Sequence, residues 1–397
     1  TVKPGDRVLR GQLIGAAAEG LGCPVHSSVS GTVRAFGTRP NAQGRPVQTV
    51  IIENDGLMEL SPDIKPFEKK LGDTSPEEIV DVIRRAGISG MGGATFPTWA
   101  KLSGAIGKVK KMIINCAECE PFITVNHRLM LEHPDEIVGG AKILLRALGL
   151  PHGDIAIEDN KLDAADSISA AIGDSPLLRV RIMRTKYPQG DERQLIFALT
   201  GREIPEGKLP ADVGCVIMNV TSVSTLGKFL KTGIPLVTKR VTVEGDAIAK
   251  PQNIEVPIGT LYRDVIEACG GIKEGVELGK IIFGGPMMGA AAPSADFPVL
   301  KQNNGLLLFS KKAAALPEPS ACIRCGRCIE ACPMGLEPVV IAQDFANKDF
   351  SALKARCVDL CVACGSCTYA CPAKRPVSQT MGLAKGWYMA ELRKGGK

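Results

Sequence analysis

Residues 322–333 read "CIRCGRCIEACP", and this stretch decides what the C-terminal part of the chain is built around. The pattern is C-x2-C-x2-C-x3-C-P, and it recurs 39 residues later, in residues 361–372. In two-cluster ferredoxins the first three cysteines of such a run bind one [4Fe–4S] cubane, and the fourth binds the other. The predicted ligands of the first cluster are Cys322, Cys325, Cys328 and Cys371. The predicted ligands of the second cluster are Cys361, Cys364, Cys367 and Cys332.

Structural zinc is the alternative reading of these cysteines. Zinc sites usually use two C-x2-C pairs, whereas each run here has three evenly spaced cysteines and a fourth before proline. Gly326 and Gly365 allow the tight turns that aim backbone N–H groups at sulfur. Cys357 lies just outside the second run and fills no ligand position, so we expect it to be a buried or partly exposed thiol.

Length and composition predict an intracellular protein of several domains. The chain has 397 residues, too many for one core, and its 14 cysteines cluster in metal-ligand spacing, which favours a reducing compartment. The net charge of +6 indicates ordinary solubility or a docking face for an acidic partner. No basic run is interleaved with aromatic residues, so nucleic-acid binding is unsupported.

No stretch approaches the ~20 apolar residues that span a bilayer. The chain starts without Met, so a missing N-terminal segment and a targeting signal stay open.

A glycine-rich loop lies in residues 87–102, "GISGMGGATFPTWAKL". Gly90, Gly92 and Gly93 let the backbone approach a ligand and present N–H groups to phosphate, and Lys101 supplies a cation nearby. The loop does not match the dinucleotide fingerprint G-x-G-x-x-G. A tight turn between helices would explain it equally well, so the loop alone is a weak signal.

Three later segments carry candidate polar residues, and in two of them these residues follow a buried strand, where ligands of α/β sheets bind. Residues 111–122, "KMIINCAECEPF", carry Asn115, Glu118 and Glu120 after an apolar strand. The other candidates are Gly190, Asp191 and Glu192, in a turn that opens a helix, and Asn219, Thr221 and Ser222, after the strand "CVIMN". Cys116 and Cys119 have no second C-x2-C pair nearby, and we expect them not to be ligands.

These four segments, in this order, resemble the flavin-carrying, NADH-oxidising subunit of respiratory complex I. The resemblance covers about residues 75–235 and implies an α/β domain that binds FMN, with NADH stacked on the flavin. One departure is Met91, which stands where that family has an arginine.

The resemblance assigns a role to each candidate residue. It implies that Gly90, Gly92, Gly93 and Lys101 line the phosphate and nucleotide side. It places Asn115, Glu118 and Glu120 at the ribityl chain and ring edge, and Asn219 and Thr221 at the FMN phosphate. Gly190, Asp191 and Glu192 are expected to face the flavin and the nicotinamide nucleotide. The implied catalytic residues are Glu192, Asp191 and Glu118.

The segments around this domain predict a multidomain α/β chain. Residues 1–60 look like a barrel-sandwich module of the biotinyl or lipoyl type, but residues 16–29 contain no lysine, so we expect a structural or docking module. The predicted FMN/NADH domain is 61–235, a β-grasp domain with a return strand is 236–310, and an α-helical two-[4Fe–4S] domain is 311–397. The tail after Pro376 is expected to pack on the cluster domain, with an amphipathic surface helix as the alternative.

This order of modules resembles the C subunit of the Rnf electron-transport complex across nearly the whole chain. The resemblance implies a peripheral subunit on the cytoplasmic face of the cell membrane, which passes electrons between NADH, FMN and two [4Fe–4S] clusters. Its expected partners are the membrane and iron–sulfur subunits of that ion-translocating complex and, indirectly, ferredoxin. The alternative function is a soluble cobalamin reductase of the propanediol-utilisation type. A ferredoxin-like scaffold without flavin is a third hypothesis.

Overall fold

A four-stranded parallel sheet forms the centre of the α/β domain in the computed structural model, which describes residues 2–41, 44–69, 71–93 and 95–395. The strand order is β8 (Leu178–Met183), β7 (Gly153–Glu158), β6 (Lys111–Asn115) and β9 (Cys215–Asn219). Neighbouring strands are all parallel. Strands β6, β7 and β9 are mostly apolar and almost entirely buried, as expected for a parallel sheet that helices cover on both faces.

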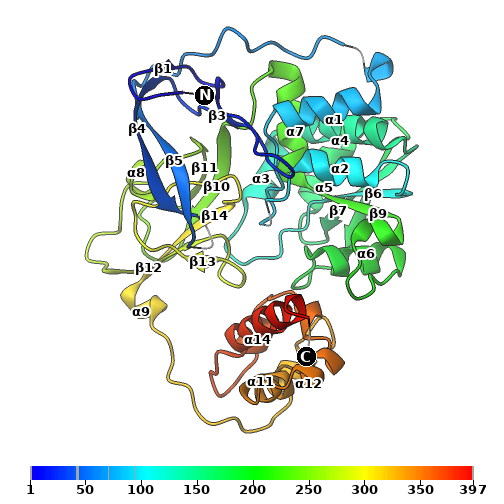
Figure 1. The fold of residues 1–397 in the computed structure, drawn as a ribbon, viewed down its shortest axis with the longest axis vertical. Helices are drawn as coiled ribbons and strands as arrows, with labels where there is room; N and C mark the ends of the chain where they lie inside the picture. Colours follow the sequence, from blue (N-terminus) through cyan, green and yellow to red (C-terminus); the bar gives the residue numbers. More distant parts are fainter. Residues whose placement is uncertain (1, 42–43, 70, 94, 396–397) are drawn as a thin grey trace.

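Seven α-helices flank this sheet (Figure 1). They are α1 (Pro76–Arg85), α2 (Thr98–Ala105), α3 (Val125–Glu132), α4 (Pro134–Leu148), α5 (Leu162–Ile172), α6 (Glu192–Thr200) and α7 (Val220–Thr232). Helices α4 and α7 lie unusually close, because a Cβ atom at Gly140 or Gly227 would collide with the backbone of the facing helix. Helix α6 packs on a separate core that contains Leu195 and Ile196. Short 3-10 turns complete the domain: η1 (Leu71–Asp73) and η2 (Pro210–Val213).

The N-terminal module consists of three short strands and one long hairpin, and it contacts both the α/β domain and the β-grasp domain. One sheet contains β1 (Arg7–Val8), β4 (Gly31–Pro40) and β5 (Pro46–Asn54), and a second pairs β2 (Leu13–Gly15) with β3 (Val25–His26). The Trp99 indole N–H donates to the Gly22 carbonyl at 3.1 Å, and the Ser28 hydroxyl donates to the Ile258 carbonyl at 2.6 Å. The hairpin that in a carrier protein would bear a lysine is therefore held against other domains.

The β-grasp domain follows α7 with a mixed five-stranded sheet. Its order is β11 (Gln252–Pro257), β10 (Thr238–Glu244), β14 (Gly305–Ser310), β12 (Leu278–Phe283) and β13 (Ala290–Ala291), with α8 (Tyr262–Ala268) packed on it. Strand β14 runs parallel to β10 and antiparallel to β12, so it is the expected return strand.

The C-terminal helical domain is an internal repeat in structure as well as in sequence. Its helices are α10 (Arg327–Glu330), α11 (Pro338–Ala346), α12 (Phe350–Ala355), α13 (Ser366–Tyr369) and α14 (Val377–Arg393), with η3 (Val358–Leu360). Helices α13 and α14 begin 39 residues after α10 and α11. Arg324 and Ala363, at equivalent positions, both have φ of +54°, so the two cysteine runs fold alike.

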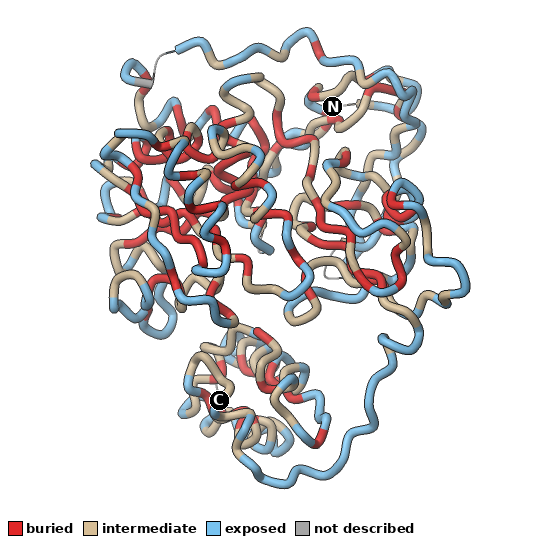
Figure 2. The backbone as a smooth tube through the Cα atoms, turned by 180° about the vertical axis from the view of Figure 1, so that it is seen from behind, coloured by how far each residue is buried: buried red, intermediate tan, exposed pale blue. Residues whose placement is uncertain are grey.

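A long exposed linker leads into this domain. After α9 (Lys311–Ala314) the backbone stays exposed through the first cysteines of the first run (Figure 2). Met381 and Tyr388 of α14 are buried in the core of the domain, so the predicted tail is a packed helix.

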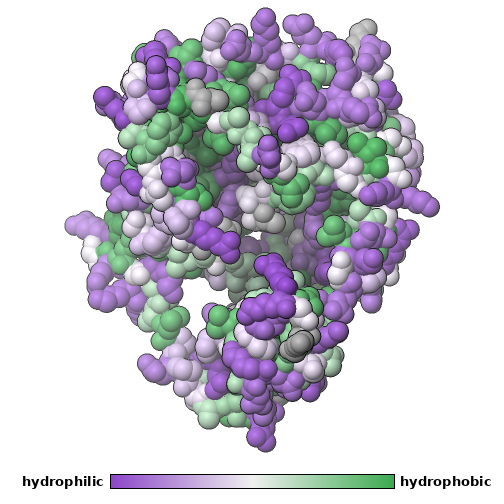
Figure 3. Space-filling view, in the orientation of Figure 1, coloured by the Kyte–Doolittle hydropathy of each residue, from purple (hydrophilic) through white to green (hydrophobic). Residues whose placement is uncertain are grey.

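Among the described residues, no helix combines the length and apolar character needed to cross a bilayer. The space-filling view is hollowed between the upper domains and the C-terminal domain (Figure 3).

Candidate functional site

The predicted polar residues converge at the carboxyl edge of the parallel sheet. Asn115 and Asn219 are directly paired at the ends of β6 and β9. The Asn219 side chain caps α7 by accepting a hydrogen bond from the Thr221 N–H at 3.0 Å. A Cβ atom on Gly92 would lie 3.1 Å from Asn219 Nδ2. The glycine loop therefore lies against the N-terminus of α7, where backbone N–H groups favour an anion.

The loop itself is anchored at its base and open at its tip. The Gly90 N–H donates to the Phe96 carbonyl at 2.8 Å, and the Met91 N–H donates to the Ser222 hydroxyl at 3.0 Å. Gly93 has a φ of +116°, a backbone conformation that favours glycine, and the space around its missing side chain is empty of described atoms. No described residue accepts a hydrogen bond from the N–H groups of Gly92 or Gly93. This tip is the part of the loop free to bind phosphate.

Met91 is only 1% exposed and belongs to the main core. The residue that departs from the complex I pattern thus lies beneath the loop. A buried thioether here helps to fix the backbone and presents nothing to a ligand.

The predicted phosphate cation and one predicted catalytic acid form an ion pair. The Lys101 ammonium contacts the Glu192 carboxylate, and both side chains are partly exposed. Asp191 caps α6, accepting from the Arg193 N–H at 2.9 Å and the Gln194 N–H at 3.2 Å, and burial raises the pKa of its carboxyl. The Asp191 carboxylate is therefore occupied by backbone N–H groups, whereas the Glu192 carboxylate contacts only a side chain.

The segments 115–120 and 187–192 are bound to each other. The Asn115 amide donates to the Gly190 carbonyl at 2.8 Å, and the Gly190 N–H donates to Cys119 Sγ at 3.5 Å. A side chain at Gly190 would press on the Ala117 carbonyl, because its Cβ would lie 3.3 Å from that oxygen. Cys119 therefore has a structural contact, and Cys116 is fully buried in the main core.

Glu118 lies in a buried acidic group that the sequence only partly indicated. Its carboxylate accepts the Asn126 and His127 N–H groups at 2.7 and 3.1 Å, at the start of α3, and burial raises its pKa. Glu158, the last residue of β7, has no exposed surface and accepts from the Glu118 N–H at 3.0 Å. One oxygen of Glu158 is buried without a partner in the described structure. Glu158 could have been proposed as a site residue from the sequence, because it is an acid at the carboxyl end of a buried strand.

Glu120 and Tyr187 connect three domains. The Glu120 carboxylate accepts the Met287 and Met288 N–H groups at 3.0 and 2.8 Å, in the β-grasp loop after β12. The Tyr187 hydroxyl donates to the Cys364 carbonyl in the C-terminal domain at 2.6 Å. Burial raises the pKa of both side chains, and the nearby Glu120 raises that of Tyr187 further. Tyr187 was missing from the predicted site, although it lies only three residues before the predicted Gly190.

The C-terminal domain also docks through two further contacts beside predicted second-cluster ligands. The Gln194 amide donates to the Pro333 carbonyl, next to Cys332, at 2.9 Å. Gly365 packs on the β-grasp loop, since a Cβ atom there would lie 2.9 Å from the Met287 carbonyl.

The cysteines predicted for the second cluster surround one cavity. Its lining includes Cys332 from the first run and Cys361, Cys364 and Cys367 from the second, with apolar neighbours such as Met381. Burial, with the other three cysteines close by, raises the pKa of Cys367 to about 12. Among the described residues, no group of three His, Cys, Asp or Glu side chains is arranged to hold a single metal ion. A cubane needs no such convergence, because each thiolate binds a different iron, and this residue set fits one.

Three of the cysteines predicted for the first cluster, Cys322, Cys328 and Cys371, are also neighbours, and this set is more exposed than the second. Burial raises the pKa of Cys328, and the nearby Cys371 and Cys322 raise it further. Cys322 and Cys325 are exposed, whereas Cys364 and Cys367 of the second run are each only 8% exposed. The structure therefore brings Cys332 together with the first three cysteines of the second run, and it brings Cys371 close to Cys322 and Cys328. Cys357 is half-buried in the core of this domain.

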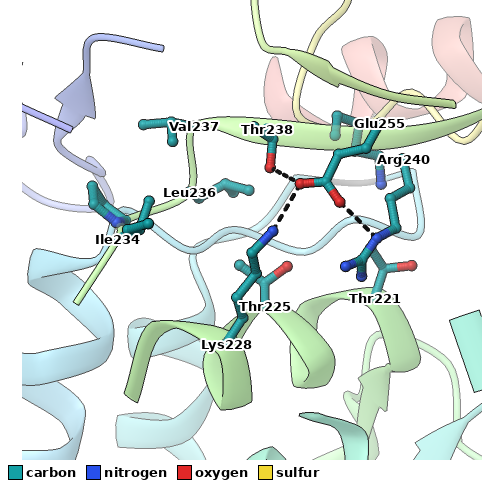
Figure 4. A pocket seen from close by; sticks show the side chains of 11 residues that line it. Thr221, Thr225, Lys228, Ile234, Leu236, Val237, Thr238, Arg240 and Glu255 are labelled. Carbon is teal, nitrogen blue, oxygen red and sulfur yellow. Dashed lines mark hydrogen bonds and ion pairs between the residues drawn. The ribbon is translucent and has the colours of Figure 1, made fainter. Parts of the chain in front are cut away.

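Another pocket lies between α7 and the start of β10, and three of its four charged side chains, Lys228, Arg240 and Glu255, are paired with one another (Figure 4). The fourth, Lys239, is buried, and its ammonium has no hydrogen-bond partner among the described residues. Glu255 accepts from Lys228 at 2.8 Å, from Arg240 at 2.9 Å and from Thr238 at 2.7 Å. Burial alone would raise the pKa of Glu255, but these partners outweigh it and lower the pKa to about 2. The pocket is an ionic junction between the α/β and β-grasp domains.

Family models match four consecutive parts of the chain. The RnfC barrel sandwich hybrid domain matches residues 1–57, and the Nuo51 FMN-binding domain matches residues 83–228. The SLBB domain matches residues 240–291, and a 4Fe-4S dicluster domain matches residues 311–375. The predicted fold class, with its order of modules, is therefore confirmed.

Curated relatives match nearly the whole chain. The C subunit of the Na(+)-translocating ferredoxin:NAD(+) oxidoreductase complex of Acetobacterium woodii is 44% identical over 99% of this chain and 88% of the relative. The C subunit of the proton-translocating complex of Clostridium ljungdahlii is 42% identical over 86% of this chain and 74% of the relative. Among solved structures, an NAD+-reducing [NiFe]-hydrogenase in the air-oxidised state has a TM-score of 0.55 at 19% identity, over 84% of this chain and 57% of that one. This last match shows a shared fold.

Proposed function

We propose that this chain exchanges electrons with NADH through FMN and two [4Fe–4S] clusters. The premise is that the chain belongs to the family of C subunits of ion-translocating ferredoxin:NAD(+) oxidoreductase complexes. The observation that carries the proposal is the hydrogen bond from Tyr187 to the Cys364 carbonyl. It joins the segment next to the glycine loop to the loop that would hold the second cluster. FMN supplies the conversion between the electron pair of a hydride and the single electrons that clusters carry.

The protein's own residues position these groups. The tip of the glycine loop and the N-terminus of α7, with Asn219 and Thr221, would hold the FMN phosphate. Asn115 fixes the 187–192 segment, and Glu192 is the acid able to leave its ion pair with Lys101 and face a bound nucleotide. Glu118 and Asp191 cap helices α3 and α6, so we propose that they act by shaping the site.

The second-cluster residues would receive electrons directly from the flavin. Every contact described above between the α/β and C-terminal domains lies beside a residue of that set: Tyr187 at Cys364, and Gln194 at Pro333 after Cys332. A short distance between two redox centres favours single-electron transfer. Docking through the residues of the second cluster would shorten the distance between the flavin and that cluster. The first-cluster residues would then connect the chain to partners.

The partners we propose are the other membrane and iron–sulfur subunits of the complex, with ferredoxin reached indirectly. The chain would lie at the cytoplasmic face of the membrane, with domains at 1–60, 61–235, 236–310 and 311–397. The cobalamin-reductase alternative is not favoured, since the relatives matching most of the chain are named as C subunits of oxidoreductase complexes.

The decisive experiment is anaerobic purification followed by flavin, iron and sulfide analysis. Two cubanes predict about eight iron and about eight sulfide per chain, with one non-covalent FMN. Gly92→Val should lose FMN and all NADH-dependent reduction, because its side chain presses on Asn219 at the phosphate position. Its clusters should still be reduced by dithionite.

Gly104→Val is the matched control, since Gly104 lies on α2 with open space beside it. This variant should keep its flavin. Stoichiometric FMN and normal reduction by NADH in Gly92→Val would show that the flavin lies elsewhere.

A further inference from the structure

The hairpin between β2 and β3 contacts both ends of the glycine loop and reaches the start of α2 (Figure 1). Near the end of the loop, the Trp99 indole N–H donates to the Gly22 carbonyl at 3.1 Å. At its start, the Cys23 thiol donates to the Ile88 carbonyl at 3.9 Å. Two adjacent hairpin residues therefore hold the two ends of a loop that is open at its tip.

Gly87 allows the hairpin to approach the start of the loop closely. It is buried and has a φ of +66°, and a Cβ atom there would lie 2.8 Å from the Pro24 carbonyl oxygen and 3.3 Å from His26 Nδ1. A side chain at this position would strain the backbone and displace the hairpin. Burial and the nearby Lys301 ammonium lower the pKa of His26 to about 4, so this imidazole adds no charge near neutral pH.

A lysine of the β-grasp domain binds the same end of the loop. Lys301 lies in the segment before β14, and its ammonium donates to the Gly87 carbonyl at 2.8 Å. Gly87 is thus held by the N-terminal module and by the β-grasp domain, whereas Gly92 and Gly93 at the tip are exposed. We call the residues that hold the ends of the loop the loop clamp: Gly22, Cys23, Pro24, His26 and Lys301.

We propose that the loop clamp is a positioning element for the FMN phosphate, because it holds the glycine loop in its binding conformation before the flavin arrives. This inference rests on the proposed function. A glycine-rich loop loses much conformational freedom when it binds a ligand, so fixing its ends beforehand lowers that cost and raises the affinity. The N-terminal module, whose hairpin lacks the lysine of a carrier, thereby contributes to flavin binding.

The clamp should affect the phosphate end of the flavin and not its ring. The glycine loop is the expected phosphate site, whereas the expected ring contacts come from residues 115–120 and 187–192. Riboflavin is FMN without its phosphate, so it separates positioning of the loop from a general effect on the domain. Loss of a clamp contact should weaken the binding of FMN and leave the binding of riboflavin unchanged.

The test removes one clamp donor at a time. Trp99→Phe removes the indole donor and keeps an aromatic ring, and Lys301→Met removes the ammonium. The matched controls are Trp387→Phe, on α14, and Lys273→Met, since Lys273 donates to the Asp246 carbonyl at 3.0 Å elsewhere in the β-grasp domain. The whole anaerobically purified chain, freed of flavin, would be titrated with FMN and with riboflavin while the flavin fluorescence is followed.

The affinity for FMN should fall about two- to tenfold in each clamp variant, as expected for the loss of one hydrogen bond. The affinity for riboflavin should stay at the wild-type value, and the controls should bind both flavins as the wild type does. Should Lys301→Met fail to fold, Trp99→Phe decides the test alone, because it keeps the ring.

Two results would overturn the proposal. One is equal affinity for FMN in the clamp and control variants. The other is equal weakening of FMN and riboflavin binding in the clamp variants, which would show a general loss of structure. Failure of the wild-type chain to bind FMN would instead contradict the proposed function.

Discussion

The two cysteine runs of the C-terminal domain are alike in backbone and opposite in surroundings. Both use a left-handed residue after the first cysteine, a glycine before the third, and a short helix that ends near the fourth. The second run is buried against Tyr187 and the β-grasp loop, whereas the first is exposed and cationic. The motif therefore determines how a cluster can be held, and the neighbouring residues determine which way electrons can enter and leave.

The largest expected difference between the runs comes from removing one ligand of each. Cys364→Ser should remove about four of about eight irons and abolish NADH reduction of the remaining cluster, because the centre nearest the flavin is lost. Cys325→Ser should remove a similar amount of iron and leave NADH reduction of the second cluster intact. Iron analysis and EPR after NADH addition check both variants. Rapid reduction of the first cluster by NADH in Cys364→Ser would contradict the claim that electrons reach the first cluster through the second.

A smaller effect is expected from the docking hydrogen bond. Tyr187→Phe removes a donor to the Cys364 carbonyl, an interaction worth about 0.5–1.5 kcal/mol. Electron transfer from flavin to the second cluster should slow by up to about tenfold, with iron and FMN unchanged. Stopped-flow reduction by NADH is the measurement. Tyr369→Phe is the matched control, because Tyr369 lies on α13 of the second run and is 82% exposed, and it should leave this rate unaffected. Equal slowing in both variants would argue against docking at Tyr187.

The potentials of the two clusters should respond differently to a single lysine. Lys385 of α14 donates to the Cys361 carbonyl at 2.7 Å, and the equivalent position in the first repeat is Ala346. Lys385→Met should lower the midpoint potential of the second cluster, because a positive charge beside a cluster ligand favours the reduced, more negative cluster. An EPR redox titration should show little change in the first cluster. A shift confined to the first cluster would reverse our assignment of the ligand sets.

The smallest effect should come from the ionic junction of Glu255, which lies away from both runs. The pKa of Glu255 is lowered to about 2 from 4.5, so its stabilising contribution is full above pH 4.5 and is lost as the pH falls toward 2. Glu255→Gln should reduce stability by about 1 kcal/mol or less near neutral pH, because the ion pairs are one-third exposed. Thermal melts at several pH values should show the difference disappearing in acid. Altered cluster reduction in this variant would mean that the β-grasp junction affects the relay.

Much of the architecture follows from local patterns in the sequence. Buried strands such as "CVIMN" and their terminal asparagines could be predicted because apolar runs and polar strand ends are local signals, and both occur where expected. The cysteine run recurs after 39 residues in the sequence, and helices α13 and α14 begin at the same interval after α10 and α11. Capping roles of Glu118 and Asp191 were not predictable in this way, because an acid that binds a ligand and one that caps a helix look alike in sequence.

Contacts between domains were also beyond the sequence. Tyr187 and Cys364 are far apart along the chain, and nothing in either segment specifies the other. Glu158 was missed for a related reason, since its role depends on Glu118 and Lys161 lying beside it in the folded domain. Sequence patterns indicated the parts and their order, whereas the relative placement of the parts required the structure.

The order in which NADH reduces the two clusters tests the account most directly. The wild-type chain would be mixed with NADH under anaerobic conditions and frozen at increasing times, and each cluster followed by EPR. The signal left in Cys325→Ser identifies the second cluster. Our account predicts that the second-cluster signal rises first and the first-cluster signal follows it. A first-cluster signal that appears before the second would contradict the placement of the second run between the flavin and the first run.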